Sequence, residues 1–296
     1  MQASEPLGLI GLPEQTDLPV VSPTWTAAGR VALIASVFFY LTVVLVGPMI
    51  ALGIETGEVG FGAALAAATS PVALEALGMS LLLVAIALVV NAVVGTFGAI
   101  ALVRHRFIGR GLVSALCDLP LAVSPVMIGL AFLLLLGRDG ALSPVLDSLG
   151  IKVVFSFPGL VIATLFVTLP YTVREVAYVL EEIGTSEEEA ATTLGASPWQ
   201  TFCRVTLPNI RVALGYGLLM TTARTLGEFG AVLVLGGSIS GQTQTATTFI
   251  HDAIEERQLD GAYGMALILA LLSVALLLSL EWAKARRNTA NGKATT

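Results

Sequence analysis

The chain has few charged residues for its length, and this scarcity excludes most soluble folds. Charged residues make up 12% of the 296 residues, whereas hydrophobic residues make up 55%. A soluble domain carries about a quarter charged residues. Together with a mean hydropathy of +0.87, the low charged fraction indicates an integral membrane protein whose main solvent is the lipid bilayer.

Other absences narrow the function further. The two cysteines, Cys117 and Cys203, lack the spacing of a disulfide framework or a zinc site. A net charge of −6 argues against binding to nucleic acid. No Lys or Arg precedes Arg30, so the basic region of a signal peptide is missing. The chain also lacks a GxxxxGK[ST] phosphate loop and the common hydrolase motifs, which argues against an enzyme and against ATP hydrolysis by this chain.

Six apolar stretches are long enough to cross a bilayer, because a spanning helix needs about 20 residues. They cover residues 31–52, 79–103, 112–136, 153–173, 212–235 and 262–280. We therefore expect an all-α polytopic membrane protein with six transmembrane helices. The domain organisation that follows is a disordered cytoplasmic tail at 1–28, a transmembrane domain at 29–283 and a basic cytoplasmic tail at 284–296.

Lys and Arg residues in the short loops predict the orientation. The loops after the second and sixth apolar stretches and between the fourth and fifth hold most of these residues: Arg104, Arg106, Arg110, Arg204, Arg211, Lys284, Arg286 and Arg287. The opposite loops hold three: Arg138, Lys152 and Arg257. Both termini are therefore expected on the cytoplasmic side of the cell (inner) membrane. In this orientation Arg174, at the cytoplasmic end of the fourth stretch, is expected to extend to the interface.

The polar stretch between the fourth and fifth spans predicts a helix, a bend and a second helix outside the membrane. Ser186 and Glu189 have the spacing of a capping box, and Gly195 suits a left-handed helix end. A second box, Ser-x-x-Gln, begins at Ser197, and Pro208 is expected to stop the second helix. The motif thus specifies a bent helix pair in a cytoplasmic loop.

Three large apolar side chains in this loop need a place to pack: Leu194, Trp199 and Phe202. One possibility is that they pack onto the ends of the protein's own helices. The other is that they dock into a groove on a partner, as amphipathic helices commonly do. The residues alone leave both possibilities open.

The spacing within this loop resembles the EAA signature of ABC importer permeases, EAA-x3-G-x9-I-x-LP. Glu189-Ala190-Ala191, Gly195 and Leu207-Pro208 match it, and Val205 departs conservatively from the Ile position. In that family the segment, here about 186–206, forms coupling helices that dock in a cleft of the ATP-hydrolysing subunit. The resemblance implies ATPase-coupling roles for these residues: Glu189, Ala190, Ala191, Gly195, Trp199 and Pro208. A purely local capping role for Glu189 stays open beside this one.

The resemblance extends from about residue 76 to the end of the sixth span, and it is greatest to the sulfate/molybdate branch, in particular to the W-type member of the paired sulfate permeases. It implies a type I ABC importer permease (MetI-like) fold. The implied function is a permease subunit of an ATP-driven sulfate or thiosulfate importer; a molybdate or tungstate permease is the alternative. The implied partners are two ATP-binding subunits, a second homologous permease and an extracytoplasmic sulfate-binding protein. This chain would bind no cofactor, since ATP and Mg²⁺ would bind to the partner ATPase.

Polar residues inside the spans are candidates for the translocation path. Arg224 and Glu228 lie four residues apart in the fifth span, so they can pair on one face. They are expected to line the pore near a gate, although a pair that merely holds two helices together is the alternative. Ser124, beside Pro120 and Pro125 in the third span, could bond a substrate or the backbone groups freed by a kink, and we favour the backbone.

Asn91 and a group of glycines complete the set of unusual residues within the spans. Asn91 is expected to form a hydrogen bond between helices. The glycines near Glu228 are expected to allow close helix packing: Gly227, Gly230, Gly236 and Gly237.

Overall fold

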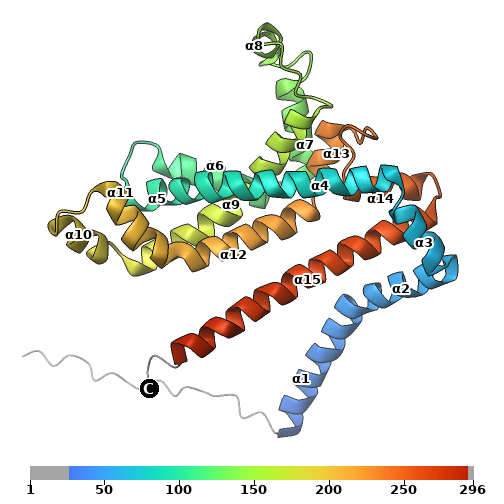
Figure 1. Ribbon diagram of the computed structural model, residues 1–296, viewed down its shortest axis with the longest axis horizontal. Helices are drawn as coiled ribbons and strands as arrows, with labels where there is room; N and C mark the ends of the chain where they lie inside the picture. Colours follow the sequence, from blue (N-terminus) through green and yellow to red (C-terminus); the bar gives the residue numbers. More distant parts are fainter. Residues whose placement is uncertain (1–26, 293–296) are drawn as a thin grey trace, which may run out of the picture. The chain divides into compact units, whose positions relative to one another are not determined.

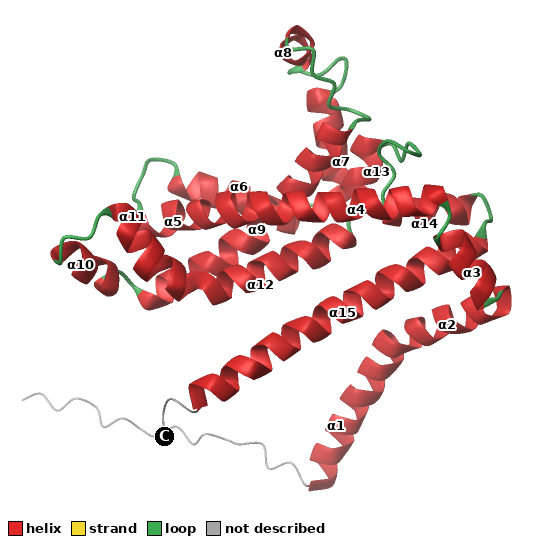
Figure 2. Cartoon of the chain, viewed as in Figure 1, coloured by secondary structure: helices red, strands yellow, loops and turns green. Residues whose placement is uncertain are grey.

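The computed structural model describes residues 27–292, and every regular element in that range is helical (Figures 1 and 2). Three of the elements, labelled η, are π-helical turns within longer helices. The elements are α1 (Ala27–Leu41), η1 (Thr42–Val46), α2 (Gly47–Val59), α3 (Phe61–Ala68), α4 (Pro71–Val90), η2 (Asn91–Gly95), α5 (Thr96–Arg104), α6 (Arg110–Ala122), α7 (Pro125–Leu136), α8 (Ser143–Ser148), α9 (Phe157–Ile183), α10 (Ser186–Thr193), α11 (Pro198–Thr201), η3 (Phe202–Thr206), α12 (Leu207–Leu226), α13 (Gly230–Gly236), α14 (Ala246–Glu255) and α15 (Leu259–Gly292). The predicted all-α class is confirmed.

The chain divides into two compact units, Met1–Ala51 and Leu52–Thr296. The predicted tail at 1–28 lies outside the described residues except for its last two, which begin α1. Of the predicted basic tail at 284–296, the part up to Gly292 continues α15, and the remainder lies outside the described range.

Four helical segments are long and apolar enough to cross a membrane. They are Val31–Val59, Pro71–Arg104, Phe157–Ile183 and Leu259–Leu276. They correspond to the first, second, fourth and sixth predicted spans. The first three are longer than the predicted stretches, because flanking residues continue the helix beyond the apolar run. The fourth segment begins three residues before the predicted one.

The third predicted span is not a single helix, and this corrects the sequence-based expectation. Helices α6 and α7 meet at an angle of 119°. The turn falls at Val123 and Ser124, whose backbones are extended, directly before Pro125. Proline disfavours the helical conformation in the residue before it and donates no hydrogen bond, which explains the break at this point. Pro120, by contrast, lies inside α6.

The fifth predicted span is also broken. Helices α12 and α13 are separated by three residues and meet at 57°. Gly227 ends α12, and α13 begins at Gly230. If each bent pair is one span, the described residues contain up to six spans.

Helices α4–η2–α5, α9 and α12 pack side by side and form the main body of the second unit (Figure 1). Two glycines allow the closest approach. A Cβ at Gly95 would lie 2.7 Å from Thr172 Cγ2, and a Cβ at Gly217 would lie 2.7 Å from Thr172 Cα. An apolar cluster that includes Val173 and Ile210 continues the packing toward α10.

A buried polar network joins the same three helices. The Asn91 side-chain amide donates to Thr168 Oγ1 at 2.9 Å and to Thr221 Oγ1 at 3.4 Å. The Thr172 and Thr221 hydroxyls lie 3.2 Å apart. The prediction that Asn91 forms a hydrogen bond between helices is therefore confirmed. In a lipid environment such bonds favour one arrangement of the helices, because an unpaired polar group has no water to bond.

The contact at Gly217 yields a stability prediction. Gly217→Ala would push α12 away from the α9 backbone, and overpacking of this kind costs about 1–3 kcal/mol. We expect a lower melting temperature of the purified protein in detergent. Gly215→Ala is the matched control, because a Cβ there would meet no described atom within 4 Å. The control should match or exceed the parent, since alanine favours helix by up to about 1 kcal/mol. Equal losses in both variants would contradict the prediction.

Candidate functional site

Helix α10 begins the stretch that resembles the EAA signature, and its start differs from the expectation. The predicted capping box of Ser186 is wrong: Thr185 is the residue that precedes the helix, and no side chain caps the first turn. The Thr185 hydroxyl instead donates to Glu189 Oε1 at 2.6 Å. Glu189 therefore bonds to the residue before the helix through its side chain, and it remains exposed.

The bend after α10 follows the prediction. Gly195 has φ +85°, the left-handed conformation that glycine adopts at least cost. Its N–H donates to Thr192 O at 2.9 Å, and the Ala196 N–H donates to Ala191 O at 3.0 Å. These two bonds define a Schellman motif, which satisfies the last carbonyl groups of the helix.

The second helix starts as predicted but does not end where predicted. Ser197 and Gln200 form both hydrogen bonds of a capping box, at 2.9 and 3.3 Å. The helix then continues through η3 into α12, so Pro208 does not stop it. In η3 the Leu207 N–H bonds to Phe202 O, five residues back. This π-helical turn accommodates a proline that can neither donate a hydrogen bond nor tolerate normal α geometry behind it.

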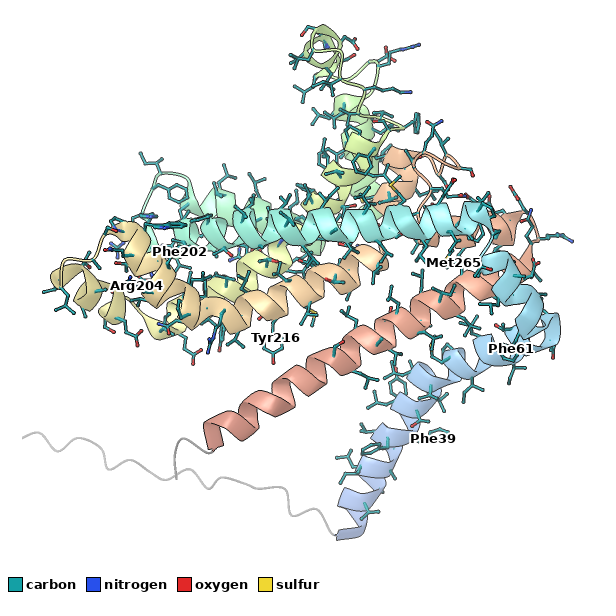
Figure 3. The ribbon with its side chains drawn as sticks, in the orientation of Figure 1. Phe39, Phe61, Phe202, Arg204, Tyr216 and Met265 are labelled. Atoms are coloured by element: carbon teal, nitrogen blue, oxygen red, sulfur yellow. The ribbon has the colours of Figure 1, made fainter. Side chains whose placement is uncertain are left out.

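The bent pair presents an exposed surface, here called the coupling surface, at one end of the bundle. Leu194 and Trp199 are 89% and 66% exposed. Glu189, Ala190, Gly195 and Pro208 are also exposed, whereas Ala191 is half-buried. Figure 3 shows Phe202 and Arg204 at this end of the bundle. The motif resemblance assigned ATPase coupling to six of these positions: Glu189, Ala190, Ala191, Gly195, Trp199 and Pro208.

The first possibility, packing onto the protein's own helices, holds for Phe202 but not for Leu194, which stays exposed. Phe202 stacks on Phe97 of α5, with ring centroids 5.4 Å apart, and it packs within the protein. Trp199 lies 5.4 Å from Phe202 and covers its outer side. Leu194 and most of Trp199 remain open to a partner.

Sequence reasoning missed the residues that hold the coupling surface in place. Arg104 Nε bonds to Glu188 Oε2 at 2.9 Å. Glu188 Oε1 accepts from the Thr206 hydroxyl at 2.8 Å. Glu187 Oε2 accepts from the Asn209 amide at 2.6 Å. In the sequence Arg104 indicates only the orientation of the chain, because its partner lies 84 residues away.

Arg224 and Glu228 do pair, as predicted. Arg224 Nη1 lies 2.6 Å from Glu228 Oε2, and the side chains are 24% and 2% exposed. Glu228 Oε1 also accepts from the Ala231 N–H at 2.9 Å, so the carboxylate caps the start of α13. The Thr247 hydroxyl donates to the Glu228 carbonyl at 2.6 Å. The pair thus sits at the break between α12 and α13.

The two broken segments meet next to this pair. A Cβ at Gly230, the first residue of α13, would lie 2.8 Å from Val126 Cγ2 at the start of α7. Ser124, which precedes α7, is exposed, and its hydroxyl makes no capping hydrogen bond. The expectation that Ser124 satisfies the freed backbone at the start of α7 is therefore wrong.

The predicted role of the glycines, close helix packing, holds at Gly230, Gly236 and Gly237 but not at Gly227. A Cβ at Gly236 would lie 3.1 Å from Leu160 Cδ1, which is also close packing. Gly237 has φ +73° and lies against the Phe155 ring, so it serves the turn as well as the contact. At Gly227 the nearest atom to a Cβ would be the Ala223 carbonyl oxygen, at 3.6 Å, so this glycine ends α12 and forms no tight contact.

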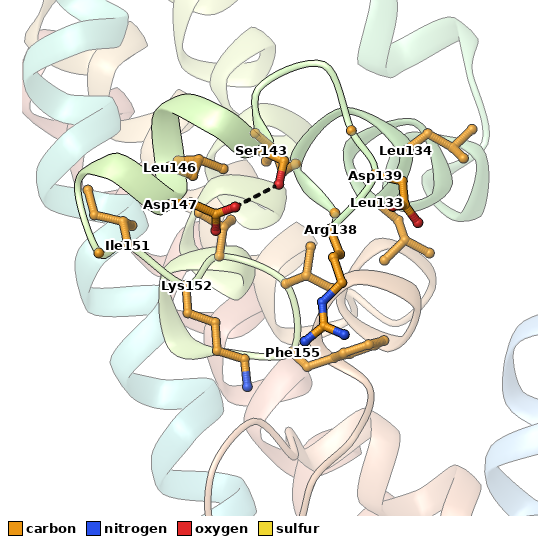
Figure 4. A pocket seen from close by; sticks show the side chains of 16 residues that line it. Leu133, Leu134, Arg138, Asp139, Ser143, Leu146, Asp147, Ile151, Lys152 and Phe155 are labelled. Atoms are coloured by element: carbon orange, nitrogen blue, oxygen red, sulfur yellow. Dashed lines mark hydrogen bonds between the residues drawn. The ribbon is translucent and has the colours of Figure 1, made fainter.

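A cavity of about 830 Å³ lies between the end of α7, α8 and the loop before α9 (Figure 4). Arg138 and Lys152 both line it, and their side chains extend toward Phe155 in Figure 4. Phe155 has φ +54°, and its N–H bonds to Leu235 O of α13 at 2.9 Å. One acidic residue of the cavity, Asp147, accepts from the Ser143 hydroxyl at 3.2 Å. Sequence reasoning used the two basic residues only to predict orientation.

Arg174 differs from its prediction. It does not simply extend to the interface: its Nε and Nη2 atoms each lie 2.5 Å from a carboxylate oxygen of Asp118 in α6. Nη2 also donates to the Ser114 carbonyl at 3.0 Å. This bidentate ion pair links α6 to α9, because the planar guanidinium group matches a carboxylate in geometry.

Comparison with known proteins places this arrangement in a family. Residues 93–287 match the sequence profile described as "Binding-protein-dependent transport system inner membrane component". The chain is 45% identical over 249 residues to the "Sulfate transport system permease protein CysW" of Synechocystis sp., covering 84% of this chain and 90% of that protein. It is 39% identical over 267 residues to the CysW protein of Escherichia coli K12, covering 89% and 90%.

Two further comparisons concern a related subunit and the fold. The "Sulfate transport system permease protein CysT" of Escherichia coli K12 is 34% identical over 247 residues, covering 83% of this chain and 89% of that protein. A chain in the "Crystal structure of bacterial alginate ABC transporter in complex with alginate pentasaccharide-bound periplasmic protein" matches with a TM-score of 0.72, at 19% identity, over 87% of this chain and 94% of that chain. The predicted MetI-like ABC importer permease fold is thereby confirmed. The chain belongs to the family of binding-protein-dependent transport system inner membrane components.

Proposed function

We propose that this chain is one permease subunit of an ATP-driven sulfate (sulfate/thiosulfate) importer. The observation that carries the proposal is the coupling surface: a signature loop folded as a capped, bent helix pair that leaves Leu194 and Trp199 exposed. The names of the sulfate permeases that resemble the chain over most of its length support the choice of anion. They favour sulfate over molybdate or tungstate.

The coupling surface would dock into a cleft of a separate ATPase. Exposed large apolar residues on a rigid, polar-rimmed helix pair suit a groove on a partner protein. Two ATP-binding subunits would hydrolyse ATP with Mg²⁺, and this chain would bind neither. A helix pair with a left-handed bend at Gly195 presents two short helices to one cleft, which a single straight helix could not do.

The orientation and the remaining partners follow from the same proposal. The coupling surface would face the cytoplasm, as would both termini, and the chain would cross the inner membrane several times. The loops at the opposite end would meet a sulfate-binding protein. A second, similar permease would complete the translocation path.

The break between α12 and α13 is the proposed gate region. Arg224 and Glu228 sit beside it, and the start of α7, preceded by Ser124, packs against α13. Broken helices within a membrane are tolerated where the backbone is buried in protein or lines a water-filled cavity. A divalent anion passing this point would meet Arg224, whose charge Glu228 balances between transport events.

The proposed transport cycle is alternating access. ATP binding would close the two ATPases on one another and draw the coupling surfaces of the two permeases together. The spans attached to those surfaces would rotate, and the path would open toward the binding protein. Hydrolysis would reverse the motion. The ATPases would shift the permeases from one state to the other because they would bind the two states with different affinities.

The direct test of the function is uptake of labelled sulfate. Proteoliposomes holding this chain with its candidate ATPase, second permease and binding protein should take up sulfate only with ATP. Excess molybdate should leave that uptake unchanged. Uptake abolished by molybdate would instead support the oxyanion-general or molybdate alternative. No uptake by an assembled complex would contradict the proposed substrate.

Substitutions in the coupling surface should separate docking from membrane insertion. Glu189→Lys places a cation in the proposed contact, and Gly195→Pro removes both the left-handed bend and an N–H that bonds to Thr192. We expect each to reduce co-purification of the ATPase and uptake at least tenfold, with normal membrane levels. Glu255→Lys, an equal charge change at an exposed position of α14 outside the coupling surface, should leave co-purification of the ATPase unaffected. Normal uptake in the Glu189 and Gly195 variants would rule out the coupling role.

A double substitution distinguishes a pore role of the ion pair from a structural role. Arg224→Gln leaves the buried Glu228 carboxylate unpaired, which costs about 3–5 kcal/mol when a buried pair is broken. The pair Arg224→Gln with Glu228→Gln removes both charges and should restore thermal stability. If Arg224 serves anion passage, uptake stays at least tenfold low in the stable double variant. Recovery of uptake together with stability would mean that the pair only holds helices.

A further inference from the structure

Arg104 connects three helices at the end of the bundle that carries the coupling surface. Arg104 is the last residue of α5, and its guanidinium reaches the end of α9 and the start of α10. Its side chain is 12% exposed, and that of its partner Glu188 is 20% exposed. A charge buried to this degree is retained only where it is paired and hydrogen-bonded.

Two bonds from Arg104 cap the C-terminal end of α9. Nη1 donates to Leu180 O at 2.9 Å, and Nη2 donates to Gly184 O at 2.6 Å. The last carbonyls of a helix have no partner within the helix and carry partial negative charge, so a cation there is favourable. Arg104 thus attaches the end of the second span to the end of the fourth.

The third bond attaches α10, and through it the start of the fifth span. Arg104 Nε donates to Glu188 Oε2, and Glu188 Oε1 accepts from the Thr206 hydroxyl in η3. Since η3 continues into α12, one guanidinium–carboxylate pair links α5, α9, α10 and α12. The apolar cluster around Val176 and Ile210 lies directly beneath, formed by the same spans.

A glycine lies in the covalent connection at each end of α10. Gly184, before it, and Gly195, after it, both have positive φ, at +65° and +85°, and a Cβ at either would meet no described atom within 4 Å. Glycines in open surroundings restrict the backbone least. Without a side-chain link, a force on α10 would turn it about these two glycines before it moved any span.

We propose that the Arg104–Glu188 pair is the mechanical joint that makes α10 move as one body with the ends of the second, fourth and fifth spans. The proposal deepens the proposed function, because it rests on the docking of an ATPase at the coupling surface. Both residues act by positioning: they lie behind the coupling surface and outside the EAA signature. Arginine suits the joint because its rigid fork serves three acceptors at once, which a lysine ammonium on a flexible stem does not.

The first test measures the joint in this chain alone, in lipid nanodiscs. Spin labels at Tyr178→Cys in α9 and Thr193→Cys in α10, both exposed positions, report the movement of α10 by double electron–electron resonance. Cys117→Ser and Cys203→Ser remove the native thiols. Arg104→Gln and Glu188→Ala should each widen the distance distribution at least twofold. Arg106→Gln, an exposed arginine in the following loop, should leave it unchanged. A distribution as narrow in Arg104→Gln and Glu188→Ala as in the parent would overturn the proposal.

The second test measures coupling in the complete transporter. In Arg104→Gln and Glu188→Ala, ATPase activity and co-purification of the ATPase should stay within twofold of the parent, while anion transported per ATP hydrolysed falls at least tenfold. Glu188→Ala guards against a folding defect, because it leaves the bonds from Arg104 to α9 intact. An unchanged transport ratio would overturn the proposal. Failure of the unaltered complex to transport sulfate would count against the proposed function, and the spin-label test would still decide the joint.

Discussion

The close contact of three helices around Thr172 is the constraint on which the rest of the structure depends. Gly95 in η2 and Gly217 in α12 bring these helices so near to α9 that a Cβ at either position would overlap with Thr172. At this distance the Asn91 amide and the threonine hydroxyls can bond between helices. Since lipid offers no hydrophobic drive for helices to associate, van der Waals contact and these bonds must supply it. The bundle then carries the coupling surface at one end and the two broken segments toward the other.

Hydropathy predicted the helices well and the breaks poorly, for a physical reason. A long apolar run must be helical in a bilayer, because every backbone group needs a partner within the segment. The runs over 112–136 and 212–235 satisfied that test in composition, yet each contains a break. Pro125 signals one and Gly227 the other, but a proline or glycine within a span usually bends it far less than 119°. What sets the size of the bend is packing, such as α13 against α7, which no local pattern reveals.

In the coupling surface too, features set by neighbouring residues were predictable, whereas contacts between residues far apart in the sequence were not. The Schellman bend at Gly195 and the box at Ser197 depend on residues within a few positions, and both were predictable. The expected stop at Pro208 was wrong because a π-helical turn can absorb a proline. Arg104 and Glu188 were missed because their partnership spans 84 residues. Their residue types alone suggested only a membrane-flanking cation and one of three acidic residues in a first turn.

The acidic first turn of α10 then acquires a distinct task for each residue. Glu188, which is half-buried, bonds to Arg104, and Glu187, although exposed, bonds to Asn209; both bonds hold the helix on the bundle. The Glu189 side chain stays exposed and accepts from the Thr185 hydroxyl, four residues before it. A short helix of eight residues is marginal by itself in water, so its position depends on the bonds to Arg104 and Asn209. A helix that transmits force needs one face bound to the bundle and one face free for the partner. Consecutive carboxylates on a helix point in different directions, because each residue rotates the chain by about 100°. The run of three acidic residues therefore supplies both faces within one turn.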